Sequence, residues 1–155
     1  FLVICTNTMH IVTPAIQAAI DIPILHIADA TARRIRAHGI QSIGLLGTNF
    51  TMEEGFYKDR LSESYGLNVL IPAKRDRDII HEVIYEELVL GQVKESSRVE
   101  YLRVIRDLQQ RGAEGVIEGC TEIVMLVQQQ HTDVPLFNTT AIHAEEAVRQ
   151  ALAQS

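Results

Sequence analysis

The chain has 155 residues, of which 46% are hydrophobic and 22% charged, and a formal net charge of −6 at pH 7. This composition is typical of a well-packed globular domain and excludes a disordered chain. The acidic balance argues against a nucleic-acid partner, because binding to a phosphate backbone depends on Lys and Arg.

Cellular location is predicted from the apolar runs and the cysteines. No run approaches the roughly 20 apolar residues needed to span a bilayer, so we expect no membrane partner. Two cysteines do not form the disulfide framework of a secreted domain, which favours the cytoplasm. The chain opens on Phe1-Leu2-Val3-Ile4 with neither Met nor a positive flank, which does not support a signal peptide. We expect a further N-terminal portion ahead of this buried run.

Apolar runs alternate with helical patterns along the whole chain, as in βα units. The runs predict strands near residues 1–5, 23–27, 42–46, 68–72, 114–118 and 135–137. The segments between them predict helices over 28–38, 52–65, 76–90, 97–111, 121–130 and 140–153. Because the strands are almost continuously hydrophobic, helices should cover both faces of the sheet. We therefore predict an α/β fold, a three-layer sandwich with a mainly parallel sheet.

Local signals set the expected helix ends. Capping patterns predict helix starts at Thr13 before Pro14, at Thr51 with Glu54, and at Ser97 with Glu100. Glycines predict helix ends at Gly39, Gly66 and Gly112.

The segment Gly119-Cys120-Thr121-Glu122 joins a predicted strand to a predicted helix. A cysteine at a helix N-terminus feels unpaired amides and the positive end of the helix dipole, which lowers its pKa and favours a nucleophilic or basic thiolate. A buried structural cysteine is an equal alternative. Position therefore makes Cys120 a candidate catalytic residue, since ligands of such folds bind at the carboxyl edge of the sheet.

Three other strand ends carry small polar side chains: 6–10, 47–51 and 138–143. Their amides and hydroxyls suit a small carboxylate ligand, and turn or cap chemistry is the alternative interpretation. The six histidines include no motif with metal-ligand spacing, so we predict no metal site.

The motifs together resemble the aspartate/glutamate racemase superfamily, in order and over the whole chain. They are Asn7–His10, Leu45–Thr51, Gly119–Ile123 and Thr139–His143. The resemblance is closest to bacterial broad-specificity or L-aspartate/glutamate-specific amino-acid racemases, where Cys5–His10 and His26–Thr31 also recur.

This resemblance implies two similar α/β domains facing each other across a cleft. On that basis, residues 1–24 and 135–155 would belong to the first domain, whose N-terminal part is missing, and 25–134 to the second. It also implies a PLP-independent racemase without cofactors that acts on a small amino-acid or dicarboxylate substrate, and a homodimer.

In relatives with two catalytic cysteines, the first cysteine directly precedes Asn-Thr. Here Thr6 holds that position, and Cys5 comes one residue earlier. A one-residue shift at a strand end turns a side chain to the other face, so we expect Cys5 to point into a core. The resemblance then implies an asymmetric site, in which Cys120 deprotonates the L-isomer and Thr6 returns the proton or positions a water.

The resemblance also implies the substrate-binding residues: Asn7, Thr8, Thr48, Thr51 and Thr121. Glu122 either orients groups around Cys120 or caps its helix. His143 either tunes the Cys120 side of the site through a hydrogen bond or is a packed histidine on the last helix. The same two roles are open for His10. Two positions depart from many relatives: Asn138 replaces Asp, and Val89 replaces a Lys.

The predicted function is cofactor-independent racemisation of aspartate and glutamate, with Cys120 and Thr6 on opposite sides of the α-carbon. One alternative is a single-cysteine decarboxylase or isomerase of the same superfamily, which protonates one face of an enolate. Another is a non-catalytic module that binds small carboxylates.

Overall fold

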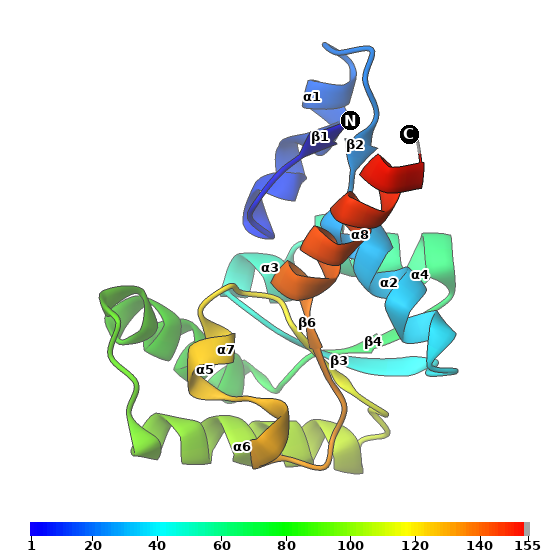
Figure 1. Ribbon diagram of the computed structural model, residues 1–155. Coiled ribbons are helices and arrows are strands. Elements are labelled where there is room, and N and C mark those ends of the chain that lie inside the picture. Colours follow the sequence, from blue (N-terminus) through cyan, green and yellow to red (C-terminus); the bar gives the residue numbers. More distant parts are fainter. Residues whose placement is uncertain (154–155) are drawn as a thin grey trace.

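A four-stranded parallel sheet forms the centre of the computed structural model, which describes residues 1–153 (Figure 1). Its strands lie in the order β4, β3, β5, β6, and each neighbouring pair is parallel. Their bounds are Ser42–Leu46 for β3, Asn68–Leu70 for β4, Val116–Glu118 for β5 and Leu136–Asn138 for β6. The predicted α/β class with a parallel sheet is confirmed.

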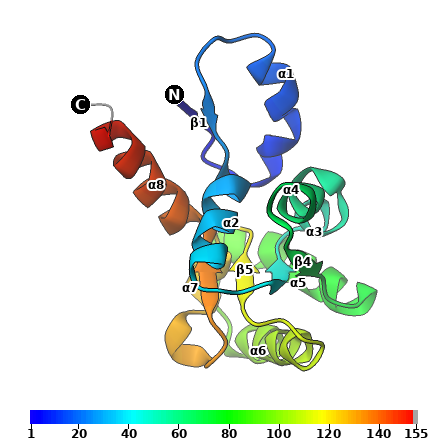
Figure 2. The same cartoon turned by 90° about the vertical axis from the view of Figure 1, so that its right-hand side faces the viewer.

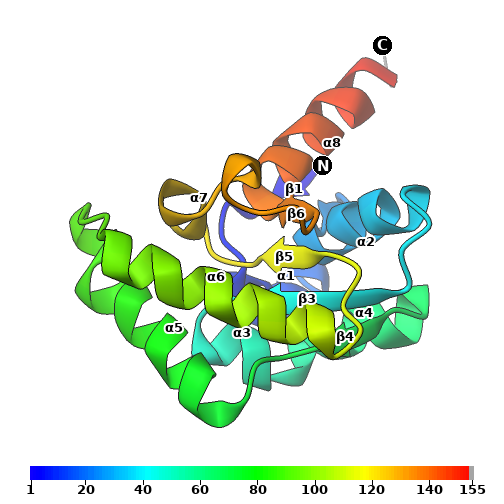
Figure 3. The ribbon, with the colours of Figure 1, turned by 90° about the horizontal axis from the view of Figure 1, so that it is seen from below.

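Helices lie on both faces of this sheet, which produces three layers. Figure 3 shows α6 (Glu95–Gln110) across one face, with α2 (Ile27–Ala37) on the other side. Helix α2 packs against α4 (Gly55–Tyr65) and α8 (Thr139–Ala153). The core between the layers is mainly aliphatic, and its fully buried side chains include Ile35, Ile43, Leu45, Ile80, Ile105 and Ile117. Burial on both sides explains why the strand sequences are almost continuously apolar.

Shorter helices follow the strand ends. Helix α3 (Asn49–Glu53) follows β3, and α7 (Ile123–Leu126) follows β5. Helix α5 (Lys74–Glu86) continues into a 3-10 turn, η2 (Leu88–Leu90), and α7 is followed by η3 (Gln129–His131). Within residues 1–153, no helix combines the length and the apolar character needed to cross a membrane.

A second, two-stranded sheet precedes the main one. Strands β1 (Leu2–Val3) and β2 (Ile24–Leu25) pair in parallel, and η1 (Thr8–Val12) and α1 (Thr13–Gln17) connect them. In Figure 2, β1 lies between α1 and α8, on the side of the molecule away from α6. Strand β6 belongs to the larger sheet, while the division into two domains at residues 24 and 135 stays a prediction.

The predicted helix starts are wrong in detail. Thr13 is the first residue of α1, and its hydroxyl is buried without a hydrogen-bond partner among the described residues. The expected helix over 52–65 is interrupted at Glu54, whose extended backbone separates α3 from α4. Thr48 caps α3 by accepting from the Thr51 amide at 3.4 Å, so Thr51 is the capped residue and not the cap.

Ser97 shows why a capping pattern alone can mislead. Helix α6 starts at Glu95, so Ser97 lies inside its first turn, and its hydroxyl donates to Glu87 at 2.6 Å. A tertiary partner has replaced the local capping interaction. The predicted glycine positions are confirmed: Gly39, Gly66 and Gly112 all have positive φ, and Gly66 ends α4 in the left-handed conformation.

Candidate active site

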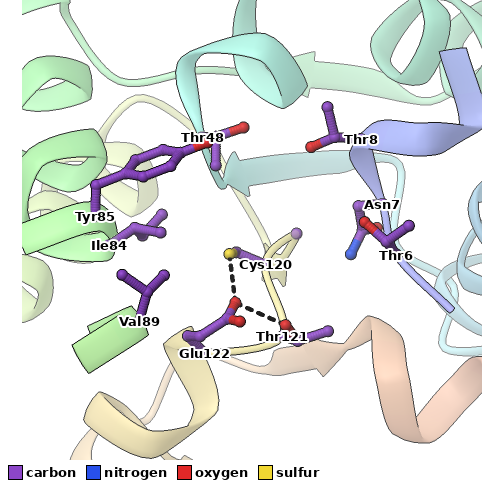
Figure 4. Close-up of a pocket in the computed structure, with 11 residues that line it drawn as sticks. Thr6, Asn7, Thr8, Thr48, Ile84, Tyr85, Val89, Cys120, Thr121 and Glu122 are labelled. Atoms are coloured by element: carbon purple, nitrogen blue, oxygen red, sulfur yellow. Dashed lines mark hydrogen bonds between the residues drawn. The ribbon is translucent and has the colours of Figure 1, made fainter. Parts of the chain in front are cut away.

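A cavity of about 190 Å³ opens where the segments after β1, β3 and β5 meet. Figure 4 shows its lining, which comes from distant parts of the chain. The polar part of the lining consists of Thr6, Asn7, Thr8, Thr48, Cys120, Thr121 and Glu122, together with Gly119. The apolar wall, opposite Thr6, consists of Ile84 and Tyr85 from α5 and Val89 from η2. The cavity therefore brings together the polar segments at the carboxyl edge of the four-stranded sheet, after β3 and β5, and the polar segment after β1 of the two-stranded sheet.

Gly119 allows the β5 segment to approach β3 closely. Its amide donates to the Leu46 carbonyl at 2.7 Å. A Cβ at this position would lie 2.7 Å from the same carbonyl oxygen, which is too close for any side chain. The glycine therefore fixes where Cys120 enters the cavity.

Cys120 is half-buried, and its thiol donates to Glu122 Oε2 at 2.9 Å. Burial and this hydrogen bond to a carboxylate raise the pKa of the Cys120 thiol to about 12. The prediction of a lowered pKa is wrong for two reasons. Helix α7 begins only at Ile123 and spans four residues, so its dipole is small, and the Glu122 charge lies beside the sulfur. At neutral pH the site holds a thiol that acts as a hydrogen-bond donor.

Glu122 receives two hydrogen bonds on one oxygen. Besides the Cys120 thiol, the Thr121 hydroxyl donates to Oε2 at 2.6 Å (Figure 4). Burial raises the pKa of Glu122, but these hydrogen bonds outweigh burial and hold the pKa below its ordinary value. The Glu122 side chain makes no capping bond to α7. Of the two roles left open, orientation of the groups around Cys120 is the one that this geometry supports.

Thr6 lines the cavity on the side opposite Glu122 and Val89 (Figure 4). Cys5 does not line this cavity, but the expectation that it points into a core is wrong, because its side chain is exposed. Strand β1 ends at Val3, so the alternation that would bury Cys5 stops before reaching it. Cys5 instead borders a separate cavity of about 150 Å³.

His10 holds the backbone of Thr6 in place. Its Nδ1 donates to the Thr6 carbonyl at 2.7 Å, and its Nε2 accepts from the Ile27 amide at 3.2 Å. Burial lowers the pKa of His10, which keeps the ring neutral and able to accept. His10 lies outside the cavity lining, so its role here is positional.

His143 is also buried, and its Nε2 donates to the Leu25 carbonyl at 2.7 Å. The ring centroid lies 5.9 Å from that of His10, which in turn lies 4.4 Å from His26. The packed role of His143 therefore has direct structural support, whereas its hydrogen bond is not directed at Cys120. No sequence pattern indicated that His26 belongs to this ring cluster.

Threonines from two strand ends meet at the top of the cavity. Thr8 and Thr48 line it, and Thr51 is fully buried behind them. The Thr51 hydroxyl lies 3.5 Å from that of Thr8 and 3.3 Å from that of Thr48. The structure thus places Thr8, Thr48 and Thr121 where a ligand can reach them, while Thr51 supports two of these from behind.

Of the apolar wall, the sequence singles out only Val89. Val89, noted as a departure from relatives, does line the cavity, and its side chain is about half exposed. Neither Ile84 nor Tyr85 carried a sequence signal as a site residue. Both reach the cavity because α5 packs beside α3, a tertiary relationship that helical periodicity does not encode.

Comparisons with known proteins agree with this fold. Residues 1–147 match the Asp/Glu/hydantoin racemase family. The broad specificity amino-acid racemase RacX of Bacillus subtilis is 22% identical over 99% of this chain and 65% of its own length. The chain thus spans about 65% of the length of this relative.

Two crystal structures are similar over nearly the whole chain. A Yersinia pestis protein proposed to be an Asp/Glu racemase is 54% identical, with a TM-score of 0.93 over 97% of this chain and 65% of its own. PH1733, an aspartate racemase homologue from Pyrococcus horikoshii, is 32% identical, with a TM-score of 0.86 over 96% of this chain and 65% of its own.

Proposed function

Because the chain belongs to the Asp/Glu/hydantoin racemase family, we propose that the full-length protein racemises amino acids without a cofactor. The observation that carries this proposal is that Cys120 and Thr6 line one cavity from different strand ends. A racemase needs an acid/base group on each face of the α-carbon. The proposed substrates, on family resemblance, are aspartate and glutamate.

The chemistry on the Cys120 face starts from a protonated thiol. Glu122 accepts the thiol proton along the existing 2.9 Å hydrogen bond, and the thiolate then removes the α-proton of the L-isomer. The electron pair left on the α-carbon spreads into the substrate carboxylate. Hydroxyl donors such as Thr8, Thr48 and Thr121 stabilise that developing charge.

Thr6 is the group proposed for the other face of the substrate α-carbon. A threonine hydroxyl is too weak an acid and base to work alone at neutral pH. It returns the proton together with a water molecule that it positions, which leaves the two directions unequal. Deprotonation of the L-isomer by Cys120 is the proposed favoured direction. Assembly as a homodimer is proposed on family resemblance alone.

A second candidate is a one-base enzyme, such as a decarboxylase that protonates one face of an enolate. One observation favours it. The single thiol that lines the cavity is a resting hydrogen-bond donor with a raised pKa, which is the state that a proton donor needs.

One experiment separates these functions. The full-length protein is incubated with L- and D-aspartate and L- and D-glutamate in deuterated water, and α-hydrogen exchange is followed by NMR. Racemisation predicts exchange with formation of the other isomer, both abolished in Cys120→Ser. Release of carbon dioxide from a malonate without amino-acid exchange supports the decarboxylase. Binding without either reaction supports a carboxylate-binding module and overturns the proposal.

A further inference from the structure

Asn7 is held by a residue that comes from the far end of the chain. Its Nδ2 donates to the Thr139 hydroxyl at 3.1 Å. Thr139 is fully buried and is the first residue of α8. The parallel pairing of β5 with β6 places Asn138 opposite Glu118, which brings Thr139 beside the end of β5. The polar strand end at 138–143 therefore contributes to the cavity indirectly.

The protons of this chain of hydrogen bonds fix the orientation of the Asn7 amide. A threonine hydroxyl has one proton to donate, and Thr139 donates it to the Glu118 carbonyl at 2.9 Å. Thr139 can then only accept from Asn7, and only the NH2 group of an asparagine donates. The amide group therefore faces Thr139 through its nitrogen.

The carbonyl oxygen of the Asn7 amide is left unsatisfied by this arrangement. Its Oδ1 is buried and has no hydrogen-bond partner among the described residues. Such an unsatisfied acceptor disfavours folding and is rare in native structures. Figure 4 shows the nitrogen of Asn7 on the side that faces Cys120. One N–H of that group is used by Thr139, and the second is left for a ligand.

We propose that Thr139 is a positioning residue, which turns the Asn7 amide so that its free N–H donates to the substrate carboxylate. This inference rests on the proposed racemisation. Negative charge grows on that carboxylate as the α-proton leaves, so a donor fixed in advance stabilises the transition state more than the ground state. The orientation matters because the opposite face of the amide would present an acceptor to a carboxylate and repel it.

The test compares Thr139→Val, which keeps the shape and loses the hydroxyl, with Thr139→Ser, which keeps the hydroxyl. For the α-hydrogen exchange of L-aspartate, we expect Thr139→Val to lower kcat by about tenfold or more with a smaller change in KM. Thr139→Ser should stay within about threefold of wild type. Thermal unfolding of each variant shows whether it is folded at the assay temperature.

A double-mutant cycle with Asn7→Ala decides whether the effect passes through Asn7. If Thr139 acts by orienting that amide, Thr139→Val changes little in the Asn7→Ala background. An equal loss in both backgrounds overturns the inference, as does a Thr139→Val variant with wild-type kcat. A wild-type protein that exchanges no α-hydrogen overturns the proposed function as well, so the two failures are distinct.

Discussion

Cys120 and Glu122 form a thiol–carboxylate pair, in which the sulfur donates to Oε2 over 2.9 Å. The resting state of the candidate site is therefore a protonated thiol beside an ionised carboxylate. Any reaction that needs a thiolate must first move that proton, and the nearest acceptor is two residues away in the sequence.

The first prediction concerns the reactivity of this thiol. In a Cys5→Ser background, alkylation of Cys120 by iodoacetamide should rise only toward pH 12, because burial and Glu122 raise its pKa to about 12. Glu122→Gln removes the adjacent charge and should move the midpoint to lower pH. Mass spectrometry of the alkylated peptide gives both curves. A wild-type midpoint near 8.5, the usual value for a free thiol, would contradict the described geometry.

The second prediction concerns Thr6, the residue proposed to act on the face of the α-carbon opposite Cys120. Thr6→Ala should reduce formation of D-aspartate from L-aspartate by about 100-fold. Deuterium should still enter the L-isomer with retention, because Cys120 can return a solvent-derived proton to the face from which it took one. Thr6→Ser should restore much of the inversion. Chiral chromatography measures the formation of D-aspartate, and NMR measures the deuterium in the L-isomer. Equal racemisation rates for Thr6→Ala and wild type would show that Thr6 takes no part in the mechanism.

The third prediction follows from Glu118, at the end of β5. Burial raises the pKa of its carboxyl to about 7 from the usual 4.5. Below pH 4.5 the group is protonated in both the folded and the unfolded chain, and between 4.5 and 7 only the unfolded chain releases the proton. The free energy of unfolding should therefore fall as pH rises through this window, by about 3 kcal/mol at pH 8.

Glu118→Gln should remove this dependence and raise the stability at pH 8. The exposed Glu63→Gln is the matched control and should leave the slope unchanged. Urea unfolding at several pH values measures both. A Glu118→Gln variant with the wild-type slope would show that the buried carboxyl does not titrate in this range.

The fourth prediction concerns Gly119. Ala at this position would place its Cβ 2.7 Å from the Leu46 carbonyl oxygen, so one of the two strand ends must move. We expect a loss of about 1–3 kcal/mol in the free energy of unfolding and a lower exchange rate, because Cys120 is displaced with its neighbour. Unchanged stability and unchanged exchange would mean that the close approach has no role in positioning the thiol.

Much of this architecture follows from local patterns. The run Ile43–Leu46 is apolar at every position that a doubly covered strand needs, and Gly66 ends α4 with a positive φ that glycine adopts without strain. Polar side chains directly after β3 and β5 then had to meet at one edge of the four-stranded parallel sheet. These are local or topological consequences of the sequence, so the four-stranded sheet and its polar edge were predictable, whereas the approach of Thr6–Thr8 from the two-stranded sheet was not.

Other features depend on partners that lie far away in the sequence. Ser97 fits a capping pattern, yet its hydroxyl bonds to Glu87, outside its own helix. Tyr85 reaches the cavity only because of how α5 packs. The direction of the pKa shift of Cys120 depends on where the Glu122 side chain points. The segment Gly119-Cys120-Thr121-Glu122 is compatible with both a capping and a thiol-binding direction, so the sequence alone does not predict it.

His10 bridges two parts of the chain through a single ring, with Thr6 on one nitrogen and Ile27 on the other. Each nitrogen is committed to a different partner, so the ring allows one tautomer and one rotation. A His10→Phe side chain would fill the same space while releasing both ends, and the amide hydrogen exchange of Ile27 should then accelerate. If it does not, the two ends are held by other contacts. Otherwise Thr6, the residue proposed to face the substrate α-carbon, and the first turn of α2 are held by the same imidazole ring. A disturbance of that helix would then move a residue of the proposed site through that ring.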